Sequence, residues 1–218
     1  MSVRLLCLWI VMSWPSVALS DELPPLPFQA AGSGDVRMSL RATGARMFDL
    51  GVDSLMDGRH LIGGDLGVDA RLLPGVLGGD VWLGLGWSSR AEQGQVHQTV
   101  DTQLSLDDLK GMAMWRLAGP RWLKPYVRAG AGARWLHTAW STGAGRVVAR
   151  DQTWMAEGAV GIDLLTSATT FSEQVGFGLS LESGYTHSPA LSLARGGVEM
   201  GDLNTSAWTW SAGVLVQF

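Results

Sequence analysis

The chain ends with the stretch WTWSAGVLVQF, from Trp208 to Phe218, in which apolar residues occupy every second position. A period of two is typical of a β-strand with one apolar face and one polar or small face. The pattern runs for eleven residues. Soluble strands usually have about 5 or 6 residues, whereas a tilted strand that crosses a bilayer needs roughly 9 to 11. The stretch therefore predicts a membrane-crossing strand.

The composition suits a single β-rich domain of 218 residues. Only 17% of the residues are charged and 46% are hydrophobic, which excludes a disordered chain. The 29 glycines are too many for a helical membrane protein. The net charge of −4 gives no indication of nucleic-acid binding.

The first 20 residues have the pattern of a cleavable secretory signal peptide. Arg4 is the positive end, Leu5 to Trp14 is the apolar run, and small residues precede a predicted cleavage after Ser20. A short buried helix or an uncleaved anchor is the alternative, but the run is shorter than the roughly 20 residues that a spanning helix needs. Cys7, the only cysteine, lies in this segment, so the mature chain is expected to have no thiol, disulfide or cysteine-based metal site.

Residues 21–34 are rich in proline and glycine and predict an extended periplasmic tether. Beyond them, residues 35–218 contain no apolar run of the length needed for a spanning helix. A chain that crosses a membrane without such a helix must form a closed barrel, because lipid offers no partners for backbone polar groups.

Period-two alternation recurs along this region and predicts eight strands. The predicted strands are 36–43, 61–72, 81–88, 100–117, 126–135, 154–164, 175–186 and 208–218. Long connections at 44–59, 90–98, 138–152 and 187–204 interleave with short turns at 74–79, 119–124 and 166–172. This interleaving is typical of a barrel with one end outside the cell and the other in the periplasm.

Two local features refine this prediction. In strand 100–117 the apolar face shifts by one residue at Asp107 and Asp108, which predicts a β-bulge. Tryptophans and the terminal phenylalanine cluster near strand ends and predict two aromatic girdles. The long-loop girdle would hold Trp87, Trp135, Trp154, Trp208 and Trp210, and the short-turn girdle Trp115, Trp122 and Phe218.

With eight strands assigned, the chain resembles the small outer-membrane barrels of the OmpA, OmpX and opacity-protein kind. The resemblance covers about residues 35–218 and is carried by PYVRAGAGARW (125–135), GAVGIDLL (158–165) and GVLVQF (213–218). It implies an all-β, eight-stranded antiparallel up-and-down transmembrane β-barrel in the outer membrane of a Gram-negative bacterium. The competing interpretation is a water-soluble β-sandwich or lipocalin-like barrel, whose apolar face would point inward.

The last strand also resembles the C-terminal signal by which such barrels are inserted. The residues that carry this signal are Trp210, Ala212, Val214, Val216 and Phe218. The resemblance implies contact with the barrel-assembly machinery during insertion, and with outer-membrane lipid and lipopolysaccharide afterwards.

The face opposite the apolar one carries charges, which a barrel would enclose. They are Arg37, Arg41, Asp65, Asp69, Arg71, Lys110, Arg116, Arg128, Arg134, Glu157, Asp163 and Glu182. An eight-stranded barrel is just wide enough for side chains to fill, so enclosed charges must pair. Three interpretations remain open: a salt-bridged plug, a narrow polar pore, or a catalytic carboxylate pair.

The sequence offers little support for chemistry at the rim. His187 and Ser188, with Glu199, resemble in kind the residues of the outer-membrane lipid A deacylases, but that family has one residue between the histidine and the serine. We therefore predict no enzyme activity, no cofactor and no metal. The acidic side chains of one loop lack the spacing of a calcium site, and no two histidines have ligand spacing. These residues are Asp49, Asp53, Asp57, His60, His97, His137 and His187.

From the sequence we expect a structural or surface-interaction role through four extracellular loops, with a charge-paired and mostly closed lumen. A narrow, porin-like channel for small solutes or ions is the alternative, and a lipid A-modifying enzyme is a third. These sequence features are specific to architecture rather than to an activity, and they indicate no particular extracellular ligand.

Overall fold

A computed structural model of the protein describes residues 35–48, 60–96, 100–120, 122–142, 145–167, 175–195 and 198–218. The predicted signal peptide (1–20), the predicted tether (21–34) and Asp49, Asp53, Asp57 and His97 lie outside these ranges. Within them, no helix has both the length and the apolar character needed to cross a membrane.

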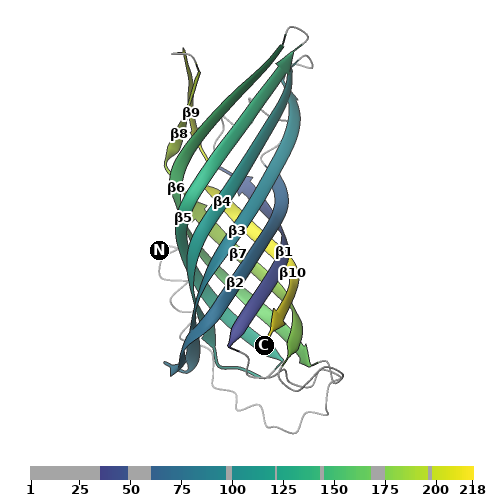
Figure 1. The fold of residues 1–218 in the computed structure, drawn as a ribbon, viewed down its shortest axis with the longest axis vertical. Coiled ribbons are helices and arrows are strands. Elements are labelled where there is room, and N and C mark those ends of the chain that lie inside the picture. Colours follow the sequence, from purple (N-terminus) through teal and green to yellow (C-terminus); the bar gives the residue numbers. More distant parts are fainter. Residues whose placement is uncertain are drawn as a thin grey trace, which may run out of the picture.

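Eight of the described strands close into an antiparallel barrel in the order β1-β10-β7-β6-β5-β4-β3-β2 (Figure 1). They are β1 (Val36–Met47), β2 (His60–Val76), β3 (Gly79–Val96), β4 (Val100–Leu117), β5 (Leu123–Thr142), β6 (Gly145–Ser167), β7 (Gly176–His187) and β10 (Ala207–Gln217). Two more strands, β8 (Ala190–Arg195) and β9 (Val198–Asn204), form a separate hairpin between β7 and β10 in the chain. The predicted fold class is confirmed.

The register of the strands determines how far they tilt. Following hydrogen-bonded neighbours once around the barrel from His60 leads back to β2 at Ala70, ten residues further along. For eight strands, this stagger corresponds to a tilt of roughly 40° from the barrel axis. Each strand therefore needs more residues than an upright strand would to cross the same thickness.

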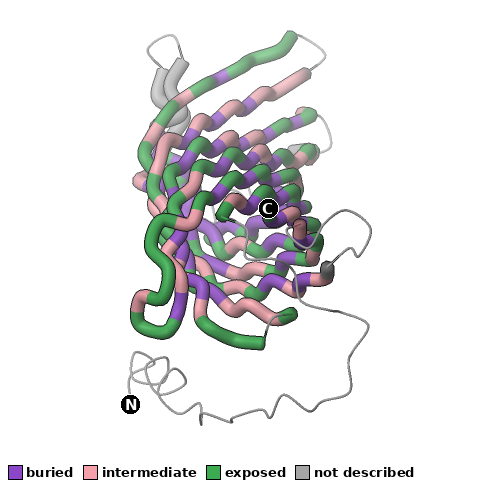
Figure 2. Tube along the Cα trace, turned by 60° about the horizontal axis from the view of Figure 1, so that its bottom comes forward, coloured by how far each residue is buried: buried purple, intermediate pink, exposed green. Residues whose placement is uncertain are grey.

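Burial alternates along the strands, as the purple and green bands of Figure 2 show. Leu66, Val160 and Val214 expose 44%, 60% and 54% of their surface on the outside, whereas Asp65 and Asp163 are buried within the barrel. The apolar face thus points outward, and the soluble alternative with its apolar face inward does not describe this part of the molecule.

Large aromatic side chains stand out from the outer face near both barrel ends. At the long-loop end Trp87, Trp154, Trp208 and Trp210 expose between 42% and 55% of their surface. Phe218 is exposed at the opposite end, where its backbone pairs with that of Val36. Of the other predicted girdle residues, Trp122 is exposed, whereas Trp115 and Trp135 are partly buried, so the arrangement matches the predicted girdles in part.

Three of the predicted long connections are wrong in extent. Strand β3 continues to Val96, and β5 and β6 continue to Thr142 and Gly145, so 90–98 and 138–152 are mostly strand. The segment 187–204 contains the β8–β9 hairpin, which lies beside β6 in Figure 1. In the upper part of β4 and β5 the apolar residues Leu104, Leu106 and Leu136 face inward, so the outward apolar row that marks the lower strands does not continue there.

The predicted β-bulge at Asp107 and Asp108 is also wrong. Strand β4 pairs with β3 and β5 in continuous register, and burial alternates without interruption from Thr102 to Arg116. The chemical character of the barrel interior changes instead. Leu104 and Leu106 point inward into an apolar cluster at the long-loop end, whereas the next inward residue of β4, Asp108, is charged. The cluster consists of Ala45, Met47, Leu61, Leu104, Leu106, Leu136, Leu191, Leu203 and Ala207.

Candidate functional site in the barrel lumen

The charges inside the barrel fall into three layers, of which the lowest lies toward the short turns. Arg37 donates from Nε and Nη2 to the carboxylate of Asp163, at 3.0 Å each, and from Nη1 to Asp69 at 2.6 Å. Arg116 lies 3.2 Å from Asp163 and donates to the amide oxygen of Gln217 at 2.7 Å. This layer thus has two cations and two anions.

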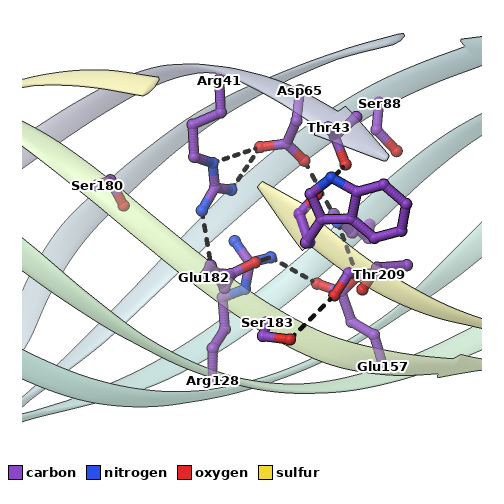
Figure 3. Close-up of polar contacts among 12 residues, drawn as sticks. Arg41, Thr43, Asp65, Ser88, Arg128, Glu157, Ser180, Glu182, Ser183 and Thr209 are labelled. Carbon is purple, nitrogen blue, oxygen red and sulfur yellow. Dashed lines mark hydrogen bonds and ion pairs between the residues drawn. The ribbon is translucent and has the colours of Figure 1, made fainter. Parts of the chain in front are cut away.

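The middle layer is drawn in Figure 3. Arg41 donates from Nε to Asp65 at 2.9 Å and from Nη1 to Glu182 at 3.0 Å. Lys110 donates to Glu157 at 2.8 Å and lies 3.5 Å from Asp65. Arg128 lies within 3.0 Å of Glu157 and donates to Glu182 at 2.5 Å. These three cations and three anions form a closed ring of ion pairs.

The upper layer contains two residues that sequence reasoning missed. Arg134 donates to Asp108 from Nε at 2.6 Å and from Nη2 at 2.9 Å, and Arg90 donates to the same carboxylate at 3.2 Å. Arg134 also donates to the backbone carbonyl of Thr205 at 2.7 Å. Asp108 and Arg90 were missed because 90–98 was predicted as a loop and a bulge was placed at Asp107. An uninterrupted alternation through β4 would have placed Asp108 inside with Lys110.

Neutral side chains join the lower layers. The Tyr126 hydroxyl donates to Glu182 at 3.0 Å in the middle layer, and the Ser180 hydroxyl lies 3.2 Å from both Tyr126 and Arg37. The Asp69 carboxylate lies close to the backbone of Gly84, where a Cβ would be only 2.2 Å from it. The glycine therefore leaves the space in which Asp69 reaches Arg37.

Charge balances within the lower and middle layers but not in the upper one. There, two arginines share the single carboxylate of Asp108, which leaves one net positive charge among the described residues of that layer. Each paired side chain of the three layers exposes 8% or less of its surface. A cavity of about 10 Å³, lined by Thr43, Asp65, Arg90 and other residues, has room for about one water molecule.

One predicted member lies apart from this network. Arg71 is at the short-turn rim, where it pairs with Asp35 and lies 4.0 Å from Asp80. Its side chain exposes 23% of its surface. This corrects its predicted place in the lumen: its side chain has the inward parity of Asp69, but at the end of β2 it is partly exposed and contacts carboxylates of the rim.

The residues of the predicted insertion signal lie on the outer face of β10. Trp210 and Val214 are exposed, Ala212 lies between them on the same face, and Phe218 follows the strand. Val216 is partly covered. At the upper end Trp210 lies over Gly44, where a Cβ would be 2.2 Å from its ring.

The rim residues considered for catalysis face different ways. Ser188 is buried and its hydroxyl contacts that of Thr205, whereas His187 is exposed and packs its ring against Trp154. Neighbouring residues of an extended chain point to opposite sides. The Nδ1 atom of the His187 ring lies 3.4 Å from the hydroxyl of Ser206. The Glu199 side chain lies outside the described part.

No group of three or more histidine, cysteine or acidic side chains with metal-binding geometry occurs among the described residues. His60 packs edge-on against Trp210, and His137 lies 3.8 Å from Asp107 on the outer face of the barrel.

Neither a family model nor a curated protein matches the sequence, but several solved structures match the fold. The attachment invasion locus protein Ail of Yersinia pestis is 12% identical, over 85% of this chain and 99% of that one, with a TM-score of 0.53. Ail in complex with the heparin analogue sucrose octasulfate matches with the same identity and coverage and a TM-score of 0.52. Neisserial surface protein A is 14% identical, over 84% of this chain and 97% of that one, with a TM-score of 0.49. The chain thus has the fold of the small outer-membrane β-barrels.

Proposed function

We propose that the protein resides in the bacterial outer membrane and has a structural or surface-interaction role, without an open pore and without enzyme activity. The outward apolar band and its aromatic borders support this location, because only lipid makes such a surface favourable. The fold shared with Ail supports it as well.

The main support for a closed barrel without an open pore is that side chains fill its lumen. A channel wide enough for water would leave its charged lining accessible, whereas the side chains of the three layers expose 8% or less. Buried charges of this kind are stable only when they are paired and hydrogen-bonded. The ion pairs therefore act as a plug that joins strands on opposite sides of the barrel.

Single-channel recording of the refolded protein in planar bilayers tests this proposal. We expect no steady open conductance. A matched variant that replaces Arg41, Asp65, Lys110 and Glu157 by serine keeps the charge balance, opens space in the middle layer and is expected to conduct. Steady conductance of the unaltered protein would overturn the plug and favour the narrow channel.

The surface role is supported by the part of the barrel wall that continues past the rim. Strands β3 to β6 extend beyond the level at which β2 begins at His60 and β1 ends at Met47, and they form a four-stranded sheet there. Ail, whose name describes attachment and invasion, has the same fold. We propose that this sheet is the interacting surface.

The C-terminal strand supports a proposed contact with the barrel-assembly machinery. Its outward row from Trp210 to Phe218 is the apolar pattern that such barrels present for insertion. Replacing Phe218 by serine is expected to lower the fraction of protein that reaches the outer membrane in cells, while refolding in detergent is unchanged. Equal loss in both assays would assign Phe218 to stability instead.

A further inference from the structure

Each strand of the projecting sheet carries an unbroken outward row that begins in the lipid-facing band. On β4 this row runs from Leu109 through Asp107, Ser105 and Gln103 to Asp101. Leu109, the apolar residue of this row, pairs in register with Trp87 of β3 and Ala133 of β5. The polar residues of the row lie above it, toward the tip of β4. The upper face therefore looks sideways, over the lipids that surround the barrel.

A polar groove of about 530 Å³ lies on this face near the tips of the strands. Its polar lining consists of Gln93, Gln95, Asp101, Thr102, Gln103, Ser141 and Arg146. Cross-strand register places Gln95, Asp101, Ser141 and Arg146 in one row, and Gln93 and Gln103 in the next. Gln95 donates to Asp101 at 2.8 Å, which orients both groups.

The chemistry of this lining favours sugar hydroxyls. Amide, carboxylate, hydroxyl and guanidinium groups offer both donors and acceptors at short spacing. One acid and one base leave the groove without net charge, which disfavours a polyanion such as a sulfated glycan. Four strands about 4.8 Å apart give the groove the width of a short oligosaccharide.

The height of the groove above the lipid-facing band indicates which sugars it can reach. Asp101 is eight residues beyond Leu109 along β4. At roughly 3.3 Å per residue and a tilt of about 40°, it lies roughly 20 Å above Leu109. The groove is therefore above the hydrocarbon and lateral to the barrel, where the sugars of neighbouring lipids stand.

We propose that this groove binds the outer core sugars of lipopolysaccharide molecules in the surrounding outer leaflet. The inference rests on the proposed outer-membrane location and adds a site and a ligand class to it. The glutamine amides hold the sugar hydroxyls, and Arg146 is available for a phosphate or carboxylate on the saccharide.

The test uses the mature chain refolded in phospholipid nanodiscs. The probes are lipopolysaccharide with a complete core, deep-rough lipopolysaccharide that lacks the outer core sugars, and free core oligosaccharide. We expect the complete core to bind about tenfold more tightly than the deep-rough form. The double variant Gln93→Ala, Gln103→Ala is expected to abolish this preference, since each lost hydrogen bond weakens binding by roughly fivefold.

The matched control is Gln152→Ala, an exposed outward glutamine of β6 that does not line the groove. It is expected to retain the full preference. Equal affinity for both lipopolysaccharides, or an unchanged preference in the double variant, would overturn the proposal. Binding of free oligosaccharide without binding of complete lipopolysaccharide would assign the groove to a soluble glycan and also overturn it.

Cell fractionation of the double variant and the control separates this proposal from the proposed location. If both variants reach the outer membrane and neither distinguishes the cores, the groove fails and the location stands. If the unaltered protein is absent from the outer membrane, the location fails.

Discussion

The two ends of the barrel wall are built from the same strands but have opposite polarity. Below the upper girdle, Leu85 and Leu109 face outward and Asp65 and Glu157 face inward. Above it, glutamines and charges face outward, and Leu104 and Leu136 face inward in the apolar cluster. The backbone alternation is continuous across this boundary.

The difference shows that the surroundings decide which face of a strand is apolar. In lipid, the outer face must be apolar and the charges are enclosed and paired. In water, the outer face is polar and burial of the inner face stabilises the fold, as in a soluble barrel. We therefore infer that the inversion at Asp107 and Asp108 marks the level at which the wall leaves the membrane.

The largest effect is expected from the charge layer at the boundary. Replacing Asp108 by asparagine leaves Arg90 and Arg134 buried without a carboxylate, and is expected to cost about 3 to 5 kcal/mol of unfolding free energy. Asp107→Asn, on the outer face, is expected to change it by about 0.5 kcal/mol or less. Urea unfolding followed by tryptophan fluorescence in lipid vesicles measures both. Equal effects would contradict the assignment of the two faces.

The inner apolar cluster is the next test of the comparison. Leu136 is fully buried, so Leu136→Ala is expected to cost about 2 to 5 kcal/mol by leaving a cavity. Leu109 is lipid-facing, and acyl chains can fill the space after Leu109→Ala, so a loss of about 1 kcal/mol or less is expected. The same unfolding experiment compares them. A larger loss of unfolding free energy for Leu109→Ala than for Leu136→Ala would contradict the assignment of Leu109 to the lipid-facing side and Leu136 to the interior.

Adding one charge at different heights on the outer row of β3 tests where the lipid-facing band ends. Leu85→Arg places a cation in the lipid band and is expected to cost about 2 to 4 kcal/mol. Gln93→Arg lies on the same face above the girdle and is expected to change stability by about 0.5 kcal/mol or less. Similar costs at both positions would mean that the polar row is also embedded in lipid.

The last test compares an exposed ion pair at the short-turn rim with the buried pairs of the lumen. Arg71→Ala breaks exposed ion pairs and is expected to cost about 1 kcal/mol or less, with a dependence on salt concentration. Arg37→Ala breaks a buried network on the same face and is expected to cost about 3 to 5 kcal/mol with little dependence on salt. Unfolding at low and high salt distinguishes them. A large, salt-independent loss for Arg71 would return it to the lumen network.

Much of the barrel could be predicted from the sequence, because strand periodicity is a local property. Alternation predicted the eight barrel strands, the lipid-facing side of Leu66 and Val214, and the inward direction of Arg37 and Arg41. These predictions need only the opposite orientation of neighbouring side chains in a strand.

The tertiary structure alone decided which charges pair and at what level the polarity of the two faces inverts. Asp108 meets Arg134 across the β4–β5 pairing, and Arg71 meets rim carboxylates, because register and stagger bring together residues that are far apart in sequence. Strand ends were mistaken for loops for a related reason. An alternating pattern does not by itself reveal where along a strand the enclosed face changes from polar to apolar, since the outer medium changes along one strand while the backbone does not.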